Sequence, residues 1–153
     1  MTKNVKVISR NRKARHNFSI IEDYEAGLVL MGSEIKSIRA GKVNISEGFI
    51  QEDSGGDLWV LNIHIATYEQ ASIYGHEPLR PRKLLLHKKE IDQIQSRIRE
   101  KGLTAVPLQL HLWRGRAKLQ IGLAKGKRQY DKRETLKKRD ADRQIKRALK
   151  DRY

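Results

Sequence analysis

The chain has 153 residues, of which 38% are hydrophobic and 33% are charged, so one domain with a core of its own is possible. Lys and Arg number 33 against 18 Asp and Glu, and a formal net charge of +15 indicates an anionic partner. Cysteine is absent, which excludes disulfides. The sequence also has no apolar run of membrane-spanning length and no apolar export signal. We therefore expect a cytoplasmic protein whose anionic partner is nucleic acid rather than a membrane.

Charge divides the chain into an arm (1–10), a body (11–124) and a tail (125–153). The first 15 residues hold six basic residues and no acidic one, and the tail holds 13 basic residues against five acidic ones. We expect a flexible arm, a folded body, and a tail that is disordered when free and helical when a polyanion neutralises it.

The first half of the body predicts strands around one short helix. Strands are expected at His16–Ile21 and Ala26–Met31, with a helix at Ser33–Ala40 capped by Ser33 and ended by Gly41.

A hairpin with a Gly-containing turn follows at Gly48–Glu52 and Leu58–Ile65, in which Trp59 is expected to pack in the core. Thr67–Pro81 is polar and predicts a long loop.

The second half of the body carries the clearest periodicity. A helix is predicted at His87–Lys101, where isoleucines at i, i+3 and i+7 make one stripe. Leu103–Trp113 and Ala117–Leu123 alternate apolar and polar residues around Arg114-Gly115-Arg116, as a hairpin does. The sum is a mainly β fold with short helices: a small oligonucleotide-binding (OB-like) antiparallel barrel plus a flexible basic C-terminal tail. Periodicity alone does not separate this barrel from other small barrels.

The tail has one narrow apolar stripe at helical spacing, made by Ala141, Ile145, Ala148 and Leu149. Such a helix is marginal alone in water, which is why we expect it to order on a partner.

Motifs for catalysis are missing. The five histidines show no metal-binding spacing, and neither a phosphate-binding loop nor a serine nucleophile elbow occurs. We therefore expect no enzymatic activity, no metal and no cofactor. A nuclease whose carboxylates converge only in the fold stays open, as does a structural ribosomal protein with a basic tail.

Four separated basic clusters predict a surface that surrounds a phosphate backbone. They contain Arg12, Lys13 and Arg15 beside Asn11; Lys36, Arg39 and Lys42; Arg80, Arg82 and Lys83; and Lys125, Lys127 and Arg128. A generic basic surface is the alternative. Aromatic rings that could stack on unpaired bases are Tyr24, Tyr68, Tyr74, Trp113 and Tyr130.

Five ordered runs resemble the SsrA-binding protein family, SmpB. They are NRKARH (11–16), YEAGLVLMGSEIKSIRAGKVNI (24–45), RKLLLHKKEI (82–91), KGLTAVPLQLHLW (101–113) and GLAKGKRQYDKRETLK (122–137). The resemblance covers nearly the whole chain after residue 10.

The resemblance implies a protein without enzymatic activity that binds the tRNA-like domain of transfer-messenger RNA (SsrA RNA, tmRNA). It implies delivery of that RNA to stalled ribosomes for trans-translation, which rescues the ribosome and tags the peptide. It also implies contact with elongation factor Tu through alanyl-tmRNA.

The family's RNA-binding positions match Asn11, Glu25 and Leu85 here, and Leu85 has a purely structural alternative. In the tail, the resemblance implies that Tyr130, Asp131, Lys132 and Arg133 contact the small-subunit decoding centre. The later helix would then lie in the empty mRNA channel.

Overall fold

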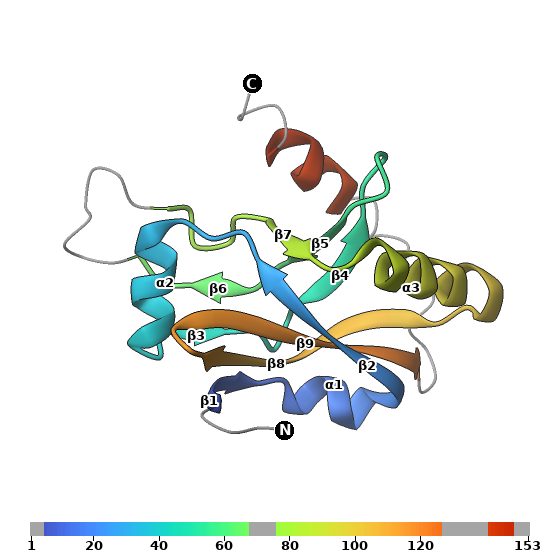
Figure 1. Ribbon diagram of the computed structural model, residues 1–153, viewed down its shortest axis with the longest axis horizontal. Coiled ribbons are helices and arrows are strands. Elements are labelled where there is room, and N and C mark those ends of the chain that lie inside the picture. The colour runs from blue at the N-terminus through green and yellow to red at the C-terminus, as the bar shows by residue number, and fades with distance from the viewer. Residues whose placement is uncertain (1–4, 68–75, 127–140, 149–153) are drawn as a thin grey trace.

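The computed structural model describes residues 5–67, 76–126 and 141–148 (Figure 1). Its body is a seven-stranded antiparallel sheet in the order β1-β8-β9-β2-β7-β5-β4, and β3 pairs with β6 beside it. The strands are β1 (Val5–Arg10), β2 (Phe18–Leu28), β3 (Val43–Asn44), β4 (Phe49–Glu52), β5 (Leu58–Leu61), β6 (His64–Ile65), β7 (Arg82–Leu85), β8 (Thr104–Trp113) and β9 (Arg116–Gly126). The helices α1 (Arg12–Asn17), α2 (Gly32–Arg39) and α3 (Lys88–Lys101) lie around the sheet.

The β8–β9 hairpin forms as its alternation predicts. Arg114 and Gly115 have φ angles of 50° and 76°, the left-handed values of a two-residue turn that matches the twist of the strands. The helices α2 and α3 are also confirmed, each within a residue of its predicted bounds, but the N-cap of α2 is Met31, and the predicted cap Ser33 contacts His76 instead. The β4–β5 hairpin is confirmed in its first part only, because the predicted strand Leu58–Ile65 breaks at Asn62, where φ is 62°, and His64–Ile65 pairs with β3 as the separate strand β6.

Two predicted strands are instead one long strand, β2. A bulge at Ile21 interrupts its pairing with β9 without ending the strand. The helix α1 was not predicted, because one turn and a half with a single buried residue, Ala14, leaves no periodic signal.

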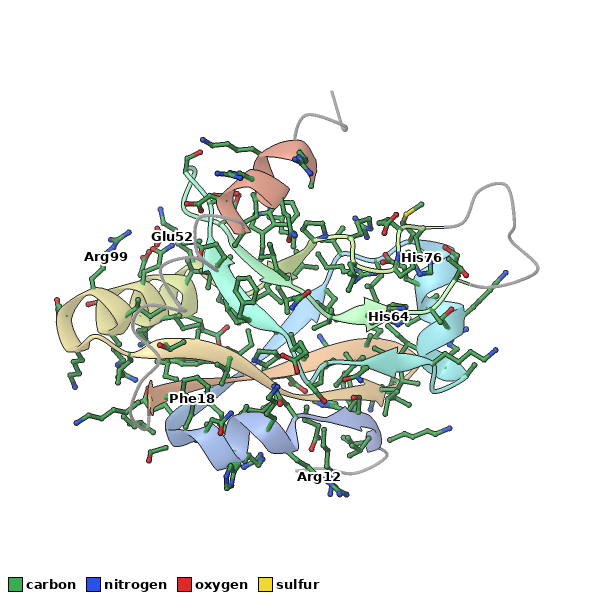
Figure 2. The ribbon with its side chains drawn as sticks, turned by 180° about the vertical axis from the view of Figure 1, so that it is seen from behind. Arg12, Phe18, Glu52, His64, His76 and Arg99 are labelled. Atoms are coloured by element: carbon green, nitrogen blue, oxygen red, sulfur yellow. The ribbon has the colours of Figure 1, made fainter. Side chains whose placement is uncertain are left out.

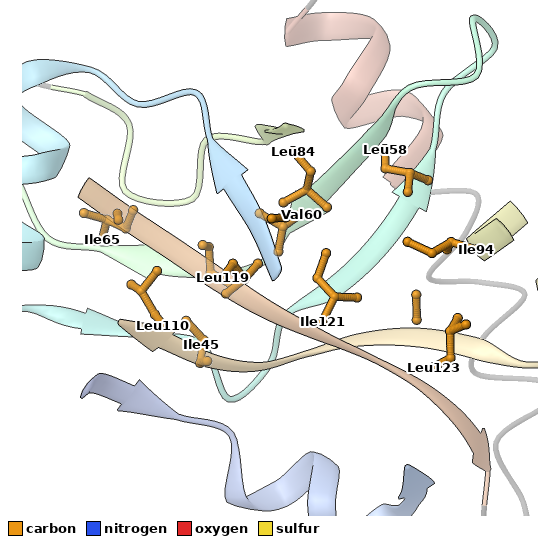
Figure 3. Close-up of a cluster of buried hydrophobic side chains, with 14 of the residues drawn as sticks. Ile45, Leu58, Val60, Ile65, Leu84, Ile94, Leu110, Leu119, Ile121 and Leu123 are labelled. Atoms are coloured by element: carbon orange, nitrogen blue, oxygen red, sulfur yellow. The ribbon is translucent and has the colours of Figure 1, made fainter. Parts of the chain in front are cut away.

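The main core lies inside the curled sheet, as Figure 3 shows. Inward side chains of β5, β8 and β9 meet Ile38 of α2 and Ile94 of α3, both fully buried. Trp59 is 1% exposed, so its predicted burial is confirmed.

The mainly β class of the prediction is confirmed, with short helices on an antiparallel sheet. The sheet curls so far that β4 comes into contact with β8 at the other side. The strand pairs within residues 5–67 and 76–126 do not include one between β4 and β8.

Both ends of the chain differ from expectation. Residues 5–10 are not a flexible arm, because β1 pairs with β8 from Val5↔Trp113 to Arg10↔Gln109. Residues 141–148 form a helix that packs on the body, where we expected disorder in the free chain.

The predicted long loop, residues 67–81, is described at residue 67 and from residue 76 onward. Residues 76–81 contain no strand or helix, as the prediction requires.

Candidate nucleic-acid interface

The first basic cluster lies on α1 and is called the α1 cluster: Arg12, Lys13 and Arg15. All three side chains are exposed, and Figure 2 shows Arg12 directed away from the body. Only Ala14 of this helix is buried, where it packs on Val106, Leu108 and Ala124 of the sheet. Burial of Ala14 fixes which side of α1 faces the protein, so the three cations lie on the solvent side.

Asn11 has a structural role that sequence reasoning did not give it. Its Oδ1 accepts from the Ala14 N–H at 3.0 Å, and its Nδ2 donates to the Pro107 carbonyl at 2.8 Å. At 2% exposure the side chain has no free surface for RNA, so the prediction of direct RNA binding by Asn11 is corrected. It caps α1 and ties that helix to β8.

A second cluster forms where α2 meets the β8–β9 turn. Arg39 donates to the Gly115 carbonyl at 3.3 Å, which brings the α2 cations beside the cations of the turn. We call this the hairpin cluster; all its side chains are exposed, and they belong to Lys36, Arg39, Lys42, Arg114 and Arg116. The guanidinium of Arg114 lies 4.7 Å from the centre of the Trp113 ring. Arg114 and Arg116 were missed, although their position in a predicted turn indicated exposure.

Arg82 does not belong to the interface. It is fully buried, and its Nε donates to Glu34 Oε2 at 2.6 Å while Nη1 donates to the Ile63 carbonyl at 2.9 Å. Arg80, 21% exposed, also pairs with Glu34. The prediction that Arg82 contacts RNA is wrong, because this cation neutralises a buried carboxylate and joins α2 to β7.

Burial acts on both partners of that ion pair. Desolvation alone would raise the pKa of Glu34, but the Arg80 hydrogen bond and the Arg82 charge outweigh it and hold the pKa below its ordinary value. Burial lowers the pKa of Arg82, partly offset by Glu34.

Glu25 and Leu85 come together on the outer face of the sheet. Glu25 is 58% exposed and Leu85 is 53% exposed. Leu85 lies opposite Gly27, two residues along β2 from Glu25. Leu85 ends the strand β7, and its exposure leaves an apolar surface on which a base can pack.

Three further side chains complete this surface, which we call the sheet face: Glu25, Leu85, His111, Lys118 and Gln120. Along β9, Leu119 and Ile121 are buried in the core, so the alternate residues Lys118 and Gln120 face outward. Glu25 lies opposite Gln120, and Lys118 lies opposite His111. The alternation in the sequence placed all three on one side of the hairpin, but it did not connect them to Glu25.

These parts follow one another along a single face of β9. Arg116 begins it in the hairpin cluster, Lys118 and Gln120 lie in the middle, and Ala124 lies beneath α1. At about 3.4 Å per residue this face runs for about 27 Å from Arg116 to Ala124. A carboxylate, an amide, an ammonium and an apolar surface thus lie between two groups of exposed cations.

The remaining predicted residues lie apart. Lys83 is 34% exposed and 3.4 Å from Asp57, and Lys125 is exposed beside Ser19, near the end of α1. Tyr24 packs against the core. The predicted Lys127, Arg128, Tyr130, Asp131, Lys132 and Arg133, with Tyr68, Tyr74 and Leu149, lie outside the described residues.

Comparison with known proteins identifies the family. The model of the SmpB protein family matches residues 8–151. The chain belongs to the SmpB family. An SsrA-binding protein of Bacillus cereus is 56% identical over 147 residues, which cover 96% of this chain and 94% of that relative. Another SmpB relative, the SsrA-binding protein of Carboxydothermus hydrogenoformans, is 53% identical over 148 residues, 97% of this chain and 99% of the relative.

A solved structure agrees with this SmpB membership. It is described as "tmRNA-SmpB: a journey to the center of the bacterial ribosome", and its matching chain is 44% identical with a TM-score of 0.65. The match covers 92% of this chain and 95% of that one.

None of the helices in the described residues combines the length and apolarity of a membrane span. In the same ranges, no three His, Asp or Glu side chains gather closely enough to hold a metal ion.

Proposed function

We propose that this SmpB protein binds the tRNA-like domain of tmRNA and delivers that RNA to stalled ribosomes for trans-translation. The activity is binding, without a catalytic step. The observation that carries the proposal is the arrangement of the sheet face between the α1 cluster and the hairpin cluster, in a chain 56% identical to an SsrA-binding protein.

Each part of the interface has a chemistry suited to RNA. Exposed Arg and Lys side chains bind phosphates without regard to sequence. The Glu25 carboxylate only accepts hydrogen bonds, so it favours base amino groups and ribose 2′-hydroxyls over phosphates. Leu85 offers an apolar contact beside it. We infer that the α1 cluster and the hairpin cluster bind the phosphate backbone of the RNA. The sheet face then recognises the shape and the base edges of the tRNA-like domain.

The tail supplies the ribosome contact in this proposal. Tyr130 stacks on ribosomal RNA at the decoding centre, with Lys132 and Arg133 on phosphates and Asp131 positioning them. The helix beyond enters the empty mRNA channel, and elongation factor Tu joins through alanyl-tmRNA. These events place the protein in the cytoplasm.

One experiment tests both halves. The wild-type chain should bind the tRNA-like domain of tmRNA more tightly than an arbitrary RNA of equal length in a mobility-shift assay. A Lys132→Glu/Arg133→Glu variant should keep that preference and lose peptide tagging in a reconstituted stalled-translation assay. Lys88→Glu/Lys89→Glu on α3 makes the same charge change at exposed positions and should tag normally.

Two results would overturn the proposal. Equal affinity for both RNAs would remove the recognition role. Normal tagging by the Lys132→Glu/Arg133→Glu variant would remove the tail role. A constitutive ribosomal protein, the alternative, would instead be found near one copy per particle in purified ribosomes that are not stalled.

A further inference from the structure

A groove lies beside α1, where β4 approaches the first residues of β8. Its lining comes mainly from α1 and the start of β2, the β3–β4 connection, β4, the end of α3 and residues 103–106. Figure 2 labels Phe18 on the α1 side of this groove and Glu52 on the β4 side. The groove has a volume of about 490 Å³, within the range of small-molecule sites. The residues of the sheet face and of the hairpin cluster do not line it, so it is a separate feature of the body.

Two phenylalanine rings give the groove flat apolar surfaces. Phe18 packs in part against Ala14 and Val106, and Phe49 packs in part against the cluster around Trp59. Both rings are half-buried, and both line the groove. An unpaired RNA base stacks on aromatic side chains of this kind whatever its sequence. The groove therefore offers a base a stacking surface that is partly shielded from water.

Two side-chain amides lie in the same lining with hydrogen-bonding capacity left over. The side chain of Asn17, the last residue of α1, has no hydrogen-bond partner in the described part of the chain. Gln51 donates from Nε2 to the Glu52 carbonyl at 3.0 Å, and this bond leaves its Oε1 available. An amide group offers a donor and an acceptor, as the edge of a base requires. The amides favour a base over a purely apolar ligand.

The acidic residues of the lining are both neutralised. Glu47 Oε1 lies 2.6 Å from Lys13 Nζ, which joins the β3–β4 connection to α1. Glu52 Oε1 lies 2.8 Å from Arg99 Nη2, which joins β4 to α3. Ion pairs as exposed as these contribute little to stability, but they cancel the charge of each carboxylate. The groove consequently does not repel the phosphates that accompany a base.

The groove lies next to the point where the tail leaves the body. Phe18 pairs with Gly126, the last residue described before the tail, and the cation of Lys125 beside it is exposed. The covalent chain spans at most about 3.6 Å per residue, so Tyr130 lies within about 14 Å of Gly126 on any path. In the proposed function Tyr130 contacts the decoding centre. The ribosomal RNA at that contact is thus within reach of the groove.

We propose that this groove is a second RNA site, in which one unpaired base of small-subunit ribosomal RNA binds. The base stacks on Phe18, and its edge bonds to the amides of Asn17 and Gln51. The exposed cations Lys101, which precedes Gly102 in the lining, and Lys125 lie near its phosphates. The source of the base rests on the proposed function, because it follows from the tail. The preference of the groove for a base does not.

The free protein tests whether the groove binds a base. We expect adenosine monophosphate to shift the NMR signals of backbone amides at residues 17–18, 51–52 and 104–106. Ribose 5-phosphate, which carries the same phosphate without a base, should leave these signals in place. Phe18→Leu should weaken adenosine monophosphate binding about fivefold or more, because it removes the stacking surface. Phe18→Tyr keeps the ring and should bind as wild type does.

A second variant avoids any change in side-chain volume. Asn17→Asp replaces the amide by a carboxylate of the same shape, so the fold is kept while the groove loses a donor and gains a negative charge. Binding of adenosine monophosphate should fall. Asn44→Asp makes the same change at an exposed position of β3 that does not line the groove, and its affinity should stay at the wild-type value.

Crosslinking tests the source of the base, because the chain has no cysteine of its own. Ser46 lines the groove, and a Ser46→Cys variant can carry an azidophenacyl group there. On stalled ribosomes with tmRNA, illumination should join it to an unpaired nucleotide of small-subunit ribosomal RNA, and Phe18→Leu should reduce the yield. Lys88→Cys, exposed on α3 outside the groove, should not reach that nucleotide.

Each failure has its own meaning. Equal shifts with adenosine monophosphate and ribose 5-phosphate, or wild-type affinity in both Phe18→Leu and Asn17→Asp, would overturn the base site. Crosslinks from Ser46→Cys to tmRNA alone, or none to the small subunit, would overturn ribosomal RNA as its source. A chain that does not bind stalled ribosomes at all would contradict the proposed function, while the nucleotide titration would still decide whether the groove binds a base.

Discussion

Glu25 of β2 and His111 of β8 are in contact across β9, the strand that separates them in the sheet, with 2.7 Å between Oε1 and Nε2. An ionised carboxylate only accepts, so Nε2 carries the proton in this contact. His111 is 6% exposed, and its Nδ1 has no hydrogen-bond partner in the described part of the chain. The buried imidazole therefore holds an exposed carboxylate in one position on the sheet face.

Replacing His111 should weaken RNA binding through Glu25. In His111→Leu the carboxylate loses its donor and becomes mobile, so we expect affinity for the tRNA-like domain to fall about tenfold, or about 1.4 kcal/mol. The salt dependence of binding should stay the same, because no phosphate contact is removed. Mobility shifts at several salt concentrations measure both quantities.

The control for that variant is His111→Gln, whose amide can still donate to Glu25 and should restore most of the affinity. The midpoint temperature of thermal unfolding of His111→Leu should equal or exceed that of wild type, since the substitution removes a buried nitrogen that has no hydrogen-bond partner. Wild-type affinity in His111→Leu would show that Glu25 needs no positioning.

The basic clusters should set the salt dependence. Arg12→Gln in the α1 cluster and Arg39→Gln in the hairpin cluster each remove one exposed cation. We expect each to reduce the slope of log K against log salt by about 0.7 to 0.9, as loss of one phosphate contact does. Lys89→Gln on α3 is the matched control and should leave the slope unchanged. A smaller slope in Lys89→Gln as well would mean that the salt dependence follows the total charge of the protein and not the two clusters.

How far the sequence predicts this molecule depends on the range of the interaction. Alternation along β8 and β9, and the isoleucine stripe of α3, are local signals, and both predictions were confirmed. The roles of Asn11 and Arg82 depend on Pro107 and Glu34, 96 and 48 residues away, so both residues looked like surface groups. A basic cluster in the sequence cannot show which of its cations the fold will bury.

The tail shows the same limit in the other direction. The stripe of Ala141, Ile145 and Ala148 correctly predicted a helix, but its partner was expected outside the protein. That partner is an outward face of β5, and four consecutive apolar residues at Leu58–Leu61 were the signal. Since a half-exposed strand alternates, such a run indicates that something covers both faces.

Glu34 should control stability at acid pH. Its pKa is lower in the folded chain than the ordinary value of 4.5, so its contribution to the free energy of unfolding is complete above that pH. The contribution is lost as the pH falls through the lowered pKa. Glu34→Gln leaves Arg82 buried without its counter-charge and should cost about 3 to 5 kcal/mol at pH 7.

Urea unfolding from pH 7 downward checks the sign of this effect. The difference between wild type and Glu34→Gln should shrink once wild-type Glu34 becomes protonated. Glu47→Gln, which removes an exposed partner of Lys13, should change stability by less than about 1 kcal/mol throughout. A difference for Glu34→Gln that does not depend on pH would contradict the ion-pair origin.

Gly122 should be needed for α1 to pack on the sheet. A Cβ added there would come 2.7 Å from Leu108 Cδ1 and 3.2 Å from Ile20 Cγ2, and both side chains belong to the small cluster beneath Ala14. Leu108 is 1% exposed and has little room to move, so Gly122→Ala should destabilise the fold by about 1 to 3 kcal/mol. The α1 cluster would shift with it, and RNA affinity should fall as well.

Gly32→Ala makes the same chemical change where nothing lies within 4 Å, at the first residue of α2. It should stabilise the protein by about 0.4 to 1 kcal/mol by restricting the unfolded chain, with RNA affinity unchanged. Denaturant unfolding and mobility shifts on the pair separate the two effects. If Gly122→Ala lowered stability and left RNA affinity at the wild-type value, the packing of α1 on β9 would not be needed for Arg12 and Arg15 to bind RNA.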